Sequence, residues 1–298
     1  MGIEIRSATP ADAAGIAAVW AAAMPHLVKT AKGIEAELRT STSRVVLIAV
    51  DGEEVVGYGN VYLPLLDDEA PRVRITVQVP PAQRGRGIGS ALAVAVVRTA
   101  EEAGARKLLI VVGDDDASKA FATRHGFTIG RRMSQAAADL AGVPEPVPVP
   151  AGLRLVDYTE VDPRSLWRAT AAVADGDPSG LSNAPEYEDW VATDWNHPDL
   201  RRDLSIAVLD GEQVVSFVTT TADPDRRVIW SNLTGTIPSY RGRGLAKVVK
   251  SAALARSRDA GFITAFTGND AGNAPMLAVN RWLGYQPTAA AWTAEKVV

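Results

Sequence analysis

Arg84-Gly85-Arg86-Gly87-Ile88-Gly89 decides the fold, because the stretch returns as Arg241-Gly242-Arg243-Gly244-Leu245-Ala246, 241 − 84 = 157 residues later. Each copy stands between an alternating, strand-like run and an alanine-rich, helix-like run. A glycine loop at the start of a helix leaves backbone N–H groups unpaired, and the helix dipole makes that end positive. The two loops therefore predict two anion sites, each suited to a phosphate-bearing ligand.

The repeat extends beyond the loops. His125-Gly126-Phe127 returns as Leu283-Gly284-Tyr285, an offset of 284 − 126 = 158, and Asp51-Gly52-Glu53 returns as Asp210-Gly211-Glu212, an offset of 210 − 51 = 159. A nearly constant offset indicates an internal duplication, and 298 residues divide into two domains of ordinary size. We expect a first domain over residues 1–142 and a second over residues 151–298.

A proline-rich segment separates these halves. Residues 143–150 read Val-Pro-Glu-Pro-Val-Pro-Val-Pro. Alternate prolines remove backbone donors and favour an extended conformation. The segment is typical of a semi-rigid connector, and we expect the domain boundary within it.

Composition narrows the function classes. The chain is 47% hydrophobic and 22% charged, as in ordinary globular proteins. It has no cysteine, which excludes disulfides, thiolate metal sites and a cysteine nucleophile, and favours a cytoplasmic location. Its three histidines, His26, His125 and His197, are too scattered for a metal motif, so we expect no metal.

Charge and hydropathy bear on possible partners. Residues 1–142 hold 16 basic and 16 acidic residues, so the totals of 31 and 35 leave 15 and 19 for residues 143–298. The net charge of −4 thus belongs to the second half and disfavours nucleic acid as a partner. No stretch approaches the roughly 18 apolar residues of a membrane span, and no apolar run follows Glu4 and Arg6 at the N-terminus. We expect neither a membrane partner nor a secretory signal.

The residues around each loop predict strand, loop, helix and strand. In the first half these are a strand over residues 73–79, a helix over 90–103 and a strand over 107–112; in the second half they cover 228–236, 245–261 and 263–267. A connection of this length makes the two strands of each half parallel and the crossover right-handed. Earlier in each half, Asp51-Gly52 and Asp210-Gly211 predict hairpins.

Neither loop has the spacing of a Walker A motif or a Rossmann fingerprint. The run Val79-Pro80-Pro81-Ala82-Gln83-Arg84-Gly85-Arg86-Gly87-Ile88-Gly89 instead resembles the central motif of the GNAT superfamily of acyl-CoA-dependent acetyltransferases, as does residues 236–246. The resemblance covers both halves nearly end to end. It implies two tandem GNAT-like domains of the α/β class, each a mixed, splayed β-sheet flanked by helices.

The resemblance also implies acetyl-CoA as co-substrate. Loop amides would bind its pyrophosphate, and its pantetheine arm would pair with the strand before the loop like an extra strand. A backbone N–H at the splay would polarise the thioester carbonyl. The implied cofactor-binding residues are Val77, Gln78, Val79, Arg84, Gly85, Arg86, Gly87, Ile88, Gly89 and Ser90 in the first half, and Thr234, Gly235, Thr236, Arg241, Gly242, Arg243, Gly244, Leu245, Ala246, Lys247 and Asn273 in the second.

The two halves depart differently from the family pattern. Many members place a Tyr four residues before the Gly-aromatic pair, to protonate the departing thiolate, and an Asn seven residues before that Tyr. The first half has Ala122 and Asp115 at these positions, whereas the second has Asn280 and Asn273. We therefore expect the second half to be catalytic and the first to be structural or to bind cofactor only. Asn232 and Asn280 are its candidate catalytic side chains; the general base stays unassigned.

Residues 175–203 occupy the place where the family builds its acceptor wall. The segment is acidic and aromatic, which suits a cationic amine through ion pairing and cation–π contact. The alternative is a solvated acidic helix face whose tryptophans belong to the core. Besides Asp175 and Asp177, the candidate acceptor residues are Glu186, Tyr187, Asp189, Trp190 and Asp194.

These observations predict an acetyl-CoA-dependent N-acetyltransferase that transfers acetyl directly to the primary amine of a cationic small molecule. The alternative function is a non-catalytic acyl-CoA-binding or regulatory protein, because the family tyrosine is missing from both halves.

Overall fold

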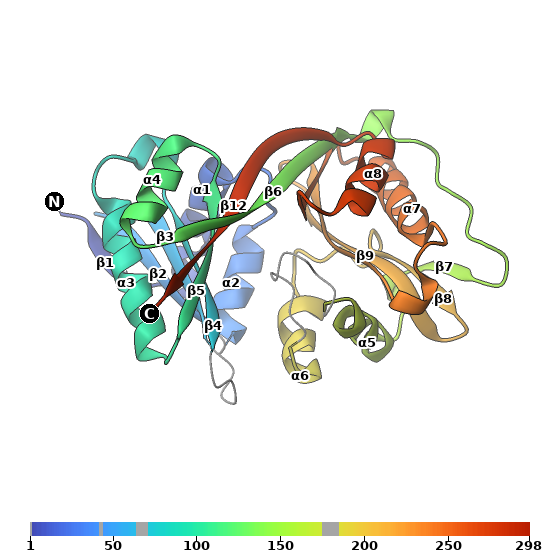
Figure 1. The fold of residues 1–298 in the computed structure, drawn as a ribbon, viewed down its shortest axis with the longest axis horizontal. Coiled ribbons are helices and arrows are strands. Elements are labelled where there is room, and N and C mark those ends of the chain that lie inside the picture. The colour runs from blue at the N-terminus through green and yellow to red at the C-terminus, as the bar shows by residue number, and fades with distance from the viewer. Residues whose placement is uncertain (1, 42–43, 64–70, 175–184) are drawn as a thin grey trace. The chain divides into compact units, whose positions relative to one another are not determined.

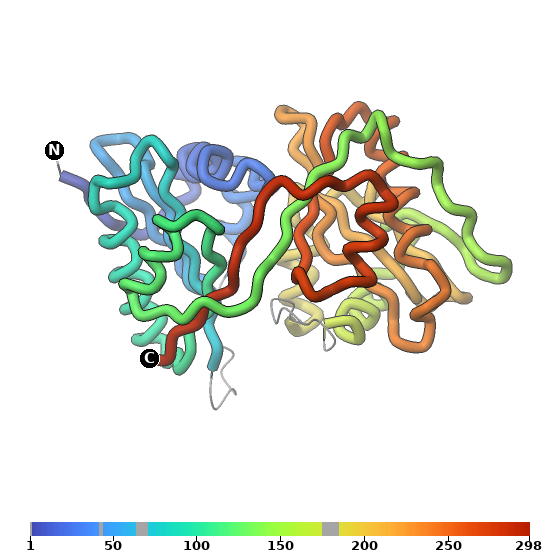
Figure 2. Tube along the Cα trace, turned by 45° about the horizontal axis from the view of Figure 1, so that its top comes forward, coloured from blue at the N-terminus to red at the C-terminus, as the bar shows by residue number. Residues whose placement is uncertain are grey.

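The computed structural model describes residues 2–41, 44–63, 71–174 and 185–298. The chain forms two compact units (Figure 1). The first comprises Met1–Arg132 together with Ala290–Val298, and the second comprises Met133–Ala289. The chain therefore crosses between the units twice, once in each of its two longest strands, as the green and red segments of Figure 2 show.

This division corrects the boundary expected within residues 143–150. The end of strand β6 (Thr128–Asp139) pairs with β11 in the second unit, so that unit begins before the proline-rich segment. The end of β12 (Gln286–Val297) pairs with β5 and completes the first unit's sheet. The proline-rich segment lies wholly in the second unit, where the Val147 N–H donates to Ser251 Oγ at 3.0 Å. It is not the connector between the units.

The first unit has the strand order β1-β2-β3-β4-β5-β12, with helices on both faces of the sheet (Figure 1). Ile48 and Val50 pack toward the first two helices, whereas Ala49 packs toward the third, as alternation along a strand requires. The remaining elements of this unit are β1 (Glu4–Ser7), α1 (Ala13–Ala23), α2 (Ala31–Thr40), β2 (Arg44–Asp51), β3 (Glu54–Tyr62), β4 (Arg72–Gln78), α3 (Ile88–Glu102), β5 (Lys107–Gly113) and α4 (Asp116–Arg124).

The second unit repeats this plan with the strand order β6-β11-β10-β9-β8-β7. Its largest core cluster joins β8, β9 and the helices on both sides of them. The elements are β7 (Arg154–Asp157), α5 (Pro163–Ala174), α6 (Tyr187–Trp190), β8 (Ile206–Asp210), β9 (Gln213–Asp223), β10 (Val228–Thr236), α7 (Leu245–Asp259), β11 (Thr264–Asp270) and α8 (Ala274–Trp282). The expected fold class, tandem mixed sheets flanked by helices, is confirmed.

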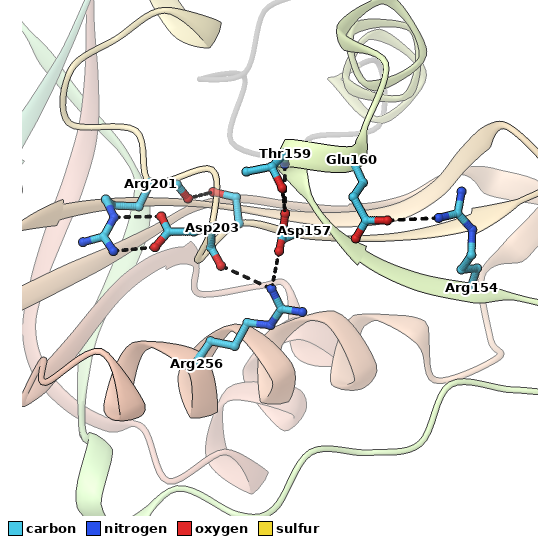
Figure 3. Close-up of polar contacts among 8 residues, drawn as sticks. Arg154, Asp157, Thr159, Glu160, Arg201, Asp203 and Arg256 are labelled. Atoms are coloured by element: carbon cyan, nitrogen blue, oxygen red, sulfur yellow. Dashed lines mark hydrogen bonds and ion pairs between the residues drawn. The ribbon is translucent and has the colours of Figure 1, made fainter.

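Charged side chains tie α7 to the edge of its sheet (Figure 3). Arg256 on α7 donates to Asp157 Oδ2 at 2.5 Å and to the Asp203 carbonyl at 3.4 Å. Asp203 in turn accepts two hydrogen bonds from Arg201. Burial alone would raise the pKa of Asp157, but hydrogen bonds from Thr159 and Arg256 outweigh it and hold that pKa below its ordinary value. The helix that follows the second loop is thus anchored at its far end.

Candidate acyl-CoA site

The two loops adopt the same backbone conformation. Gly87 and Gly244 immediately precede α3 and α7 with φ of 81° and 76°, in the left-handed region that favours glycine. Gly85 and Gly242 are also left-handed. A Cβ atom built on any of these four glycines would meet no neighbour within 4 Å, so the space beside each of them is open.

Unpaired amides converge in both loops. Within the part of the chain that the structure describes, the backbone N–H groups of residues 85–90 and 242–246 donate no hydrogen bond. The N–H groups of Arg84, Arg241 and Lys247 are already paired, the last with the Gly244 carbonyl at 3.0 Å. The expected amide set is therefore shorter than the loop sequences suggest, but each unit still has the run of unpaired amides that an anion site would need.

The first arginine of each loop has a structural role. Arg84 Nε donates to the Val79 carbonyl at 3.3 Å, and Arg241 Nε donates to the Thr236 carbonyl at 3.1 Å. Both bonds hold the loop against the end of the preceding strand.

The second arginine differs between the units. Arg86 forms an ion pair with Asp51 at 2.6 Å, so its charge is neutralised. Asp210 is the residue of the second repeat that corresponds to Asp51, and it accepts a hydrogen bond from Tyr240 instead. Arg243 lies over the Tyr240 ring at 4.5 Å. Among the described residues, Arg243 has no carboxylate partner. The second loop thus keeps a positive charge that the first has lost.

The parallel strands part in both units. In the first, β4 and β5 pair only as far as Arg74 and Leu109, although both strands continue. In the second, β10 and β11 pair as far as Ser231 and Thr267. Among the described residues, those that follow, including Thr234–Thr236 and Val77–Gln78, have no ladder partner on the splayed side.

A β-bulge distinguishes the second splay, which is the place after Ser231 and Thr267 where β10 and β11 part. The register of β10 against β9 shifts between Ser231 and Thr234, directly after the last parallel pair. The register of β4 against β3 runs without a shift through Ile75–Gln78. A bulge bends its strand and re-aims backbone groups, so β10 differs from β4 at the point where the parallel strands part.

Asn273 has a structural role that the sequence analysis did not foresee. It precedes α8, and its side chain accepts a hydrogen bond from the Met276 N–H at 3.3 Å. Asp115 caps α4 in the same way through the Ser118 N–H at 2.8 Å. The two residues are equivalent helix caps, so the difference between Asn273 and Asp115 distinguishes the two halves less than expected.

The two candidate catalytic asparagines lie on either side of the second splay. Asn280 is buried, and its Nδ2 donates to Asn269 Oδ1 at 2.6 Å. Its Oδ1 is a buried acceptor without a partner in the described part of the chain. Asn232 lies in the bulge, is exposed, and donates to Thr221 Oγ1 at 3.0 Å. Asn280 therefore has an unused hydrogen-bonding atom beside the second splay.

The expected acceptor segment separates into core and surface. Trp190 and Trp195 are buried in the main core, and Tyr187 packs between Trp167 and Trp190. Arg164 already lies over the Tyr187 ring at 3.9 Å, so that aromatic face is occupied. Glu186, Asp189 and Asp194 are exposed. Asp175 and Asp177 lie outside the described residues.

Two buried polar residues near the second splay, Lys250 and Tyr285, were missed. Tyr285 hydrogen-bonds Ser231 across 3.2 Å, and Lys250 on α7 lies over the Tyr285 ring at 5.1 Å. The missed signal was a lysine in the alanine-rich helix 245–259, at a position where the first repeat has Ala93 (250 − 157 = 93).

A sequence profile of the acetyltransferase (GNAT) family matches the chain twice, over residues 16–127 and 167–285. The chain belongs to the GNAT acetyltransferase family. It is thus an acyltransferase, and the GNAT family generally uses acetyl-CoA. The alternative of a non-catalytic protein is set aside.

Related proteins have the same tandem plan. The mycothiol acetyltransferase of Streptomyces coelicolor is 28% identical, with coverage of 80% of this chain and 75% of the relative. That of Nocardia farcinica is 30% identical, with coverage of 81% and 79%. A tandem GNAT protein from the clavulanic acid biosynthesis pathway superposes with a TM-score of 0.76 at 20% identity, covering 99% of this chain and 98% of that one. A GCN5-related N-acetyltransferase from Sphaerobacter thermophilus gives 0.72 at 17% identity, covering 99% and 95%. The solved structures support the fold.

No helix in the described ranges is long and apolar enough to cross a membrane. Over the same ranges, no group of three or more His, Cys, Asp or Glu side chains is arranged to hold a metal ion.

Proposed function

We propose that this GNAT family member is an acetyl-CoA-dependent N-acetyltransferase whose second unit performs transfer to a primary amine of a small molecule. The observation that carries the proposal is the β10 bulge at the splay of β10 and β11, which the first unit lacks. Arg243, which has no carboxylate partner among the described residues, supports the same choice of unit.

Acetyl-CoA would bind with its pyrophosphate at the amides of residues 242–246 and near Arg243. These groups supply both hydrogen-bond donors and positive charge, the two features that phosphate oxygens require. The pantetheine arm would pair with the free edge of Thr234–Thr236 as an added strand. The thioester would then lie at the bulge.

Transfer would proceed by direct attack. The neutral amine forms a bond to the thioester carbon, and a backbone N–H of the 232–236 stretch stabilises the oxyanion. The carbon–sulfur bond then breaks, and sulfur keeps the electron pair. A CoA thiolate is a moderate leaving group, because the pKa of a thiol is about 8.5.

The acceptor would meet carboxylates and not aromatic rings. Glu186, Asp189 and Asp194 are exposed and acidic, whereas Tyr187 and Trp190 pack in the core. Exposed carboxylates attract a cationic amine. The names of the related enzymes make an amine of the mycothiol type the first acceptor to test.

The first unit would serve as a structural partner or an idle cofactor site. Its loop has the amide cradle, but Asp51 neutralises Arg86 and β4 has no bulge at the splay.

The test is thiol release from acetyl-CoA in the presence of a panel of amines, with detection of the N-acetylated product. The panel includes mycothiol-type amines, aminoglycosides, polyamines and amino acids. We expect one class to raise thiol release well above hydrolysis, with stoichiometric product. Cofactor binding without amine-dependent release for any class would contradict the proposal.

A further inference from the structure

A buried lysine lies beneath the second splay. Lys250 is 1% exposed, and in the described part of the chain it has no hydrogen bond and no ion pair. Its Nζ lies 5.1 Å from the centre of the Tyr285 ring. Burial lowers the pKa of Lys250 to about 7. A group so costly to bury calls for an explanation.

Lys250, Tyr285 and Ser231 form a set of neighbouring polar residues that reaches the point where β10 and β11 part. The Tyr285 ring is 1% exposed, and its hydroxyl is 3.2 Å from Ser231 Oγ. Ser231 is the last residue of β10 to pair with β11, and the bulge follows it directly. Thr267, its partner in the ladder, donates to the Ser231 carbonyl at 3.3 Å. The Ser231 hydroxyl is therefore held at the point where the strands part.

The first unit shows that the fold does not need this set. The repeat offsets of 157 and 158 place Ala93 and Phe127 opposite Lys250 and Tyr285. The parallel ladders, which begin with Arg72–Lys107 and Val228–Thr264, place Ile75 opposite Ser231. All three counterparts are buried and apolar. The same positions of one duplicated fold are apolar in one unit and polar in the other.

We propose that Ser231, supported by Tyr285 and Lys250, stabilises the negative sulfur of the departing CoA thiolate. Ser231 is the catalytic residue, because its hydroxyl donates to the sulfur; Tyr285 and Lys250 are positioning residues. The inference rests on the proposed function of the second unit. It assigns to this set the task that the family gives to the tyrosine replaced here by Asn280.

The chemistry balances without any further reactant. In the proposed arrangement Tyr285 is the donor of the hydrogen bond that it shares with Ser231 Oγ, which leaves the Ser231 hydrogen free for the sulfur. As the carbon–sulfur bond breaks, the charge on sulfur is stabilised by that hydrogen bond, while Lys250, packed over the Tyr285 ring, holds in place the ring whose hydroxyl bonds Ser231. The amine proton and the proton that finally neutralises the thiolate are exchanged with water.

The test uses CoA itself as the probe. Ultraviolet absorbance of the thiolate gives the pKa of the bound thiol in the full-length protein. We expect it about one unit below the free value of about 8.5 in the wild type. Ser231→Ala, Tyr285→Phe and Lys250→Met should each return it toward the free value. They should lower kcat about tenfold or more and change the KM for acetyl-CoA less than about threefold.

Two controls separate the outcomes. Ser257→Ala removes a buried hydroxyl that lies on α7, toward the helix end from Lys250. It bonds the Ala253 carbonyl and no member of the set, so this variant should leave both readouts unchanged. Gly244→Glu should abolish the thiol signal; if the signal survives there, CoA is bound in the first unit and the proposed function fails. An unshifted thiol in the wild type, with CoA bound in the second unit, would overturn the inference alone.

Misfolding cannot mimic the expected result. Lys250→Met exchanges a buried amine for an apolar side chain of similar length, so it should stabilise the protein while it lowers kcat. If kcat and the thiol pKa stay at wild-type values in that variant, Lys250 has no part in the reaction.

Discussion

Single residues distinguish the two repeats. Arg86 is paired with Asp51, whereas Arg243 lies over Tyr240 without a carboxylate partner among the described residues. Ile75, Ala93 and Phe127 have polar counterparts only in the second unit. Each change is small, but together they leave the second unit with an arginine that has no carboxylate partner and with buried hydrogen-bonding groups that the first unit lacks, as the proposed transfer in that unit requires.

Lys250 predicts an unusual dependence of stability on pH. Its pKa is about 7 in the folded chain and near its ordinary value of 10.5 in the unfolded chain. Between these values the unfolded chain binds more protons, so the contribution of Lys250 to stability rises with pH across this window. Below pH 7 the full penalty applies, on the order of a few kcal/mol.

We therefore expect Lys250→Met to raise the free energy of unfolding most at pH 6 to 7 and progressively less toward pH 10. Denaturant unfolding of the wild type and of Lys250→Met across this pH range measures the difference between their free energies of unfolding. A gain that is independent of pH would show that Lys250 is not neutralised on folding.

At the scale of elements, the bulge in β10 separates two otherwise equivalent sheets. Asn232 and Leu233 together oppose Thr219 where a regular strand would place one residue. Deletion of Asn232 would restore the register that β4 shows. Because the other side chains keep their faces, we expect a folded protein.

The deletion variant should lose its acyl-transfer activity. The expected fall in kcat/KM for acetyl-CoA is at least tenfold, because the backbone groups that the bulge aims at the thioester change direction. Steady-state kinetics measures the loss, and circular dichroism with thermal unfolding checks the fold. A folded deletion variant with wild-type kinetics would show that the bulge has no role in transfer.

At the scale of the whole molecule, sequence reasoning predicted the duplication, the loops and the elements around them. These features depend on local chemistry: glycines with positive φ, alternating strands and helix caps, all legible in short windows. The crossing of β6 and β12 between the units was not predictable, because the sequences of Thr128–Asp139 and Gln286–Val297 do not reveal which sheet each strand joins. The proline-rich segment looks like a connector in sequence. Its packing against the second unit depends on a tertiary contact, the hydrogen bond from Val147 to Ser251, which a local pattern does not reveal.

The site was only partly predictable for the same reason. Loop glycines and strand edges follow from the motif, but the ion pair of Arg86 with Asp51 joins residues 35 positions apart. The set of Ser231, Lys250 and Tyr285 comes from β10, α7 and the turn between α8 and β12. The acidic and aromatic acceptor segment was resolved only by packing, which buries Trp190 and leaves Asp189 exposed.

The central claim, that the second unit transfers the acetyl group, is tested by one matched pair of variants. Gly244 and Gly87 have nearly the same positive φ and equally open surroundings, so Gly244→Glu and Gly87→Glu carry the same backbone strain. Each places a carboxylate at one of the two phosphate cradles. Initial rates of acetyl transfer should fall at least a hundredfold in Gly244→Glu and stay within about threefold of wild type in Gly87→Glu. The reverse pattern would contradict the account and assign the transfer to the first unit.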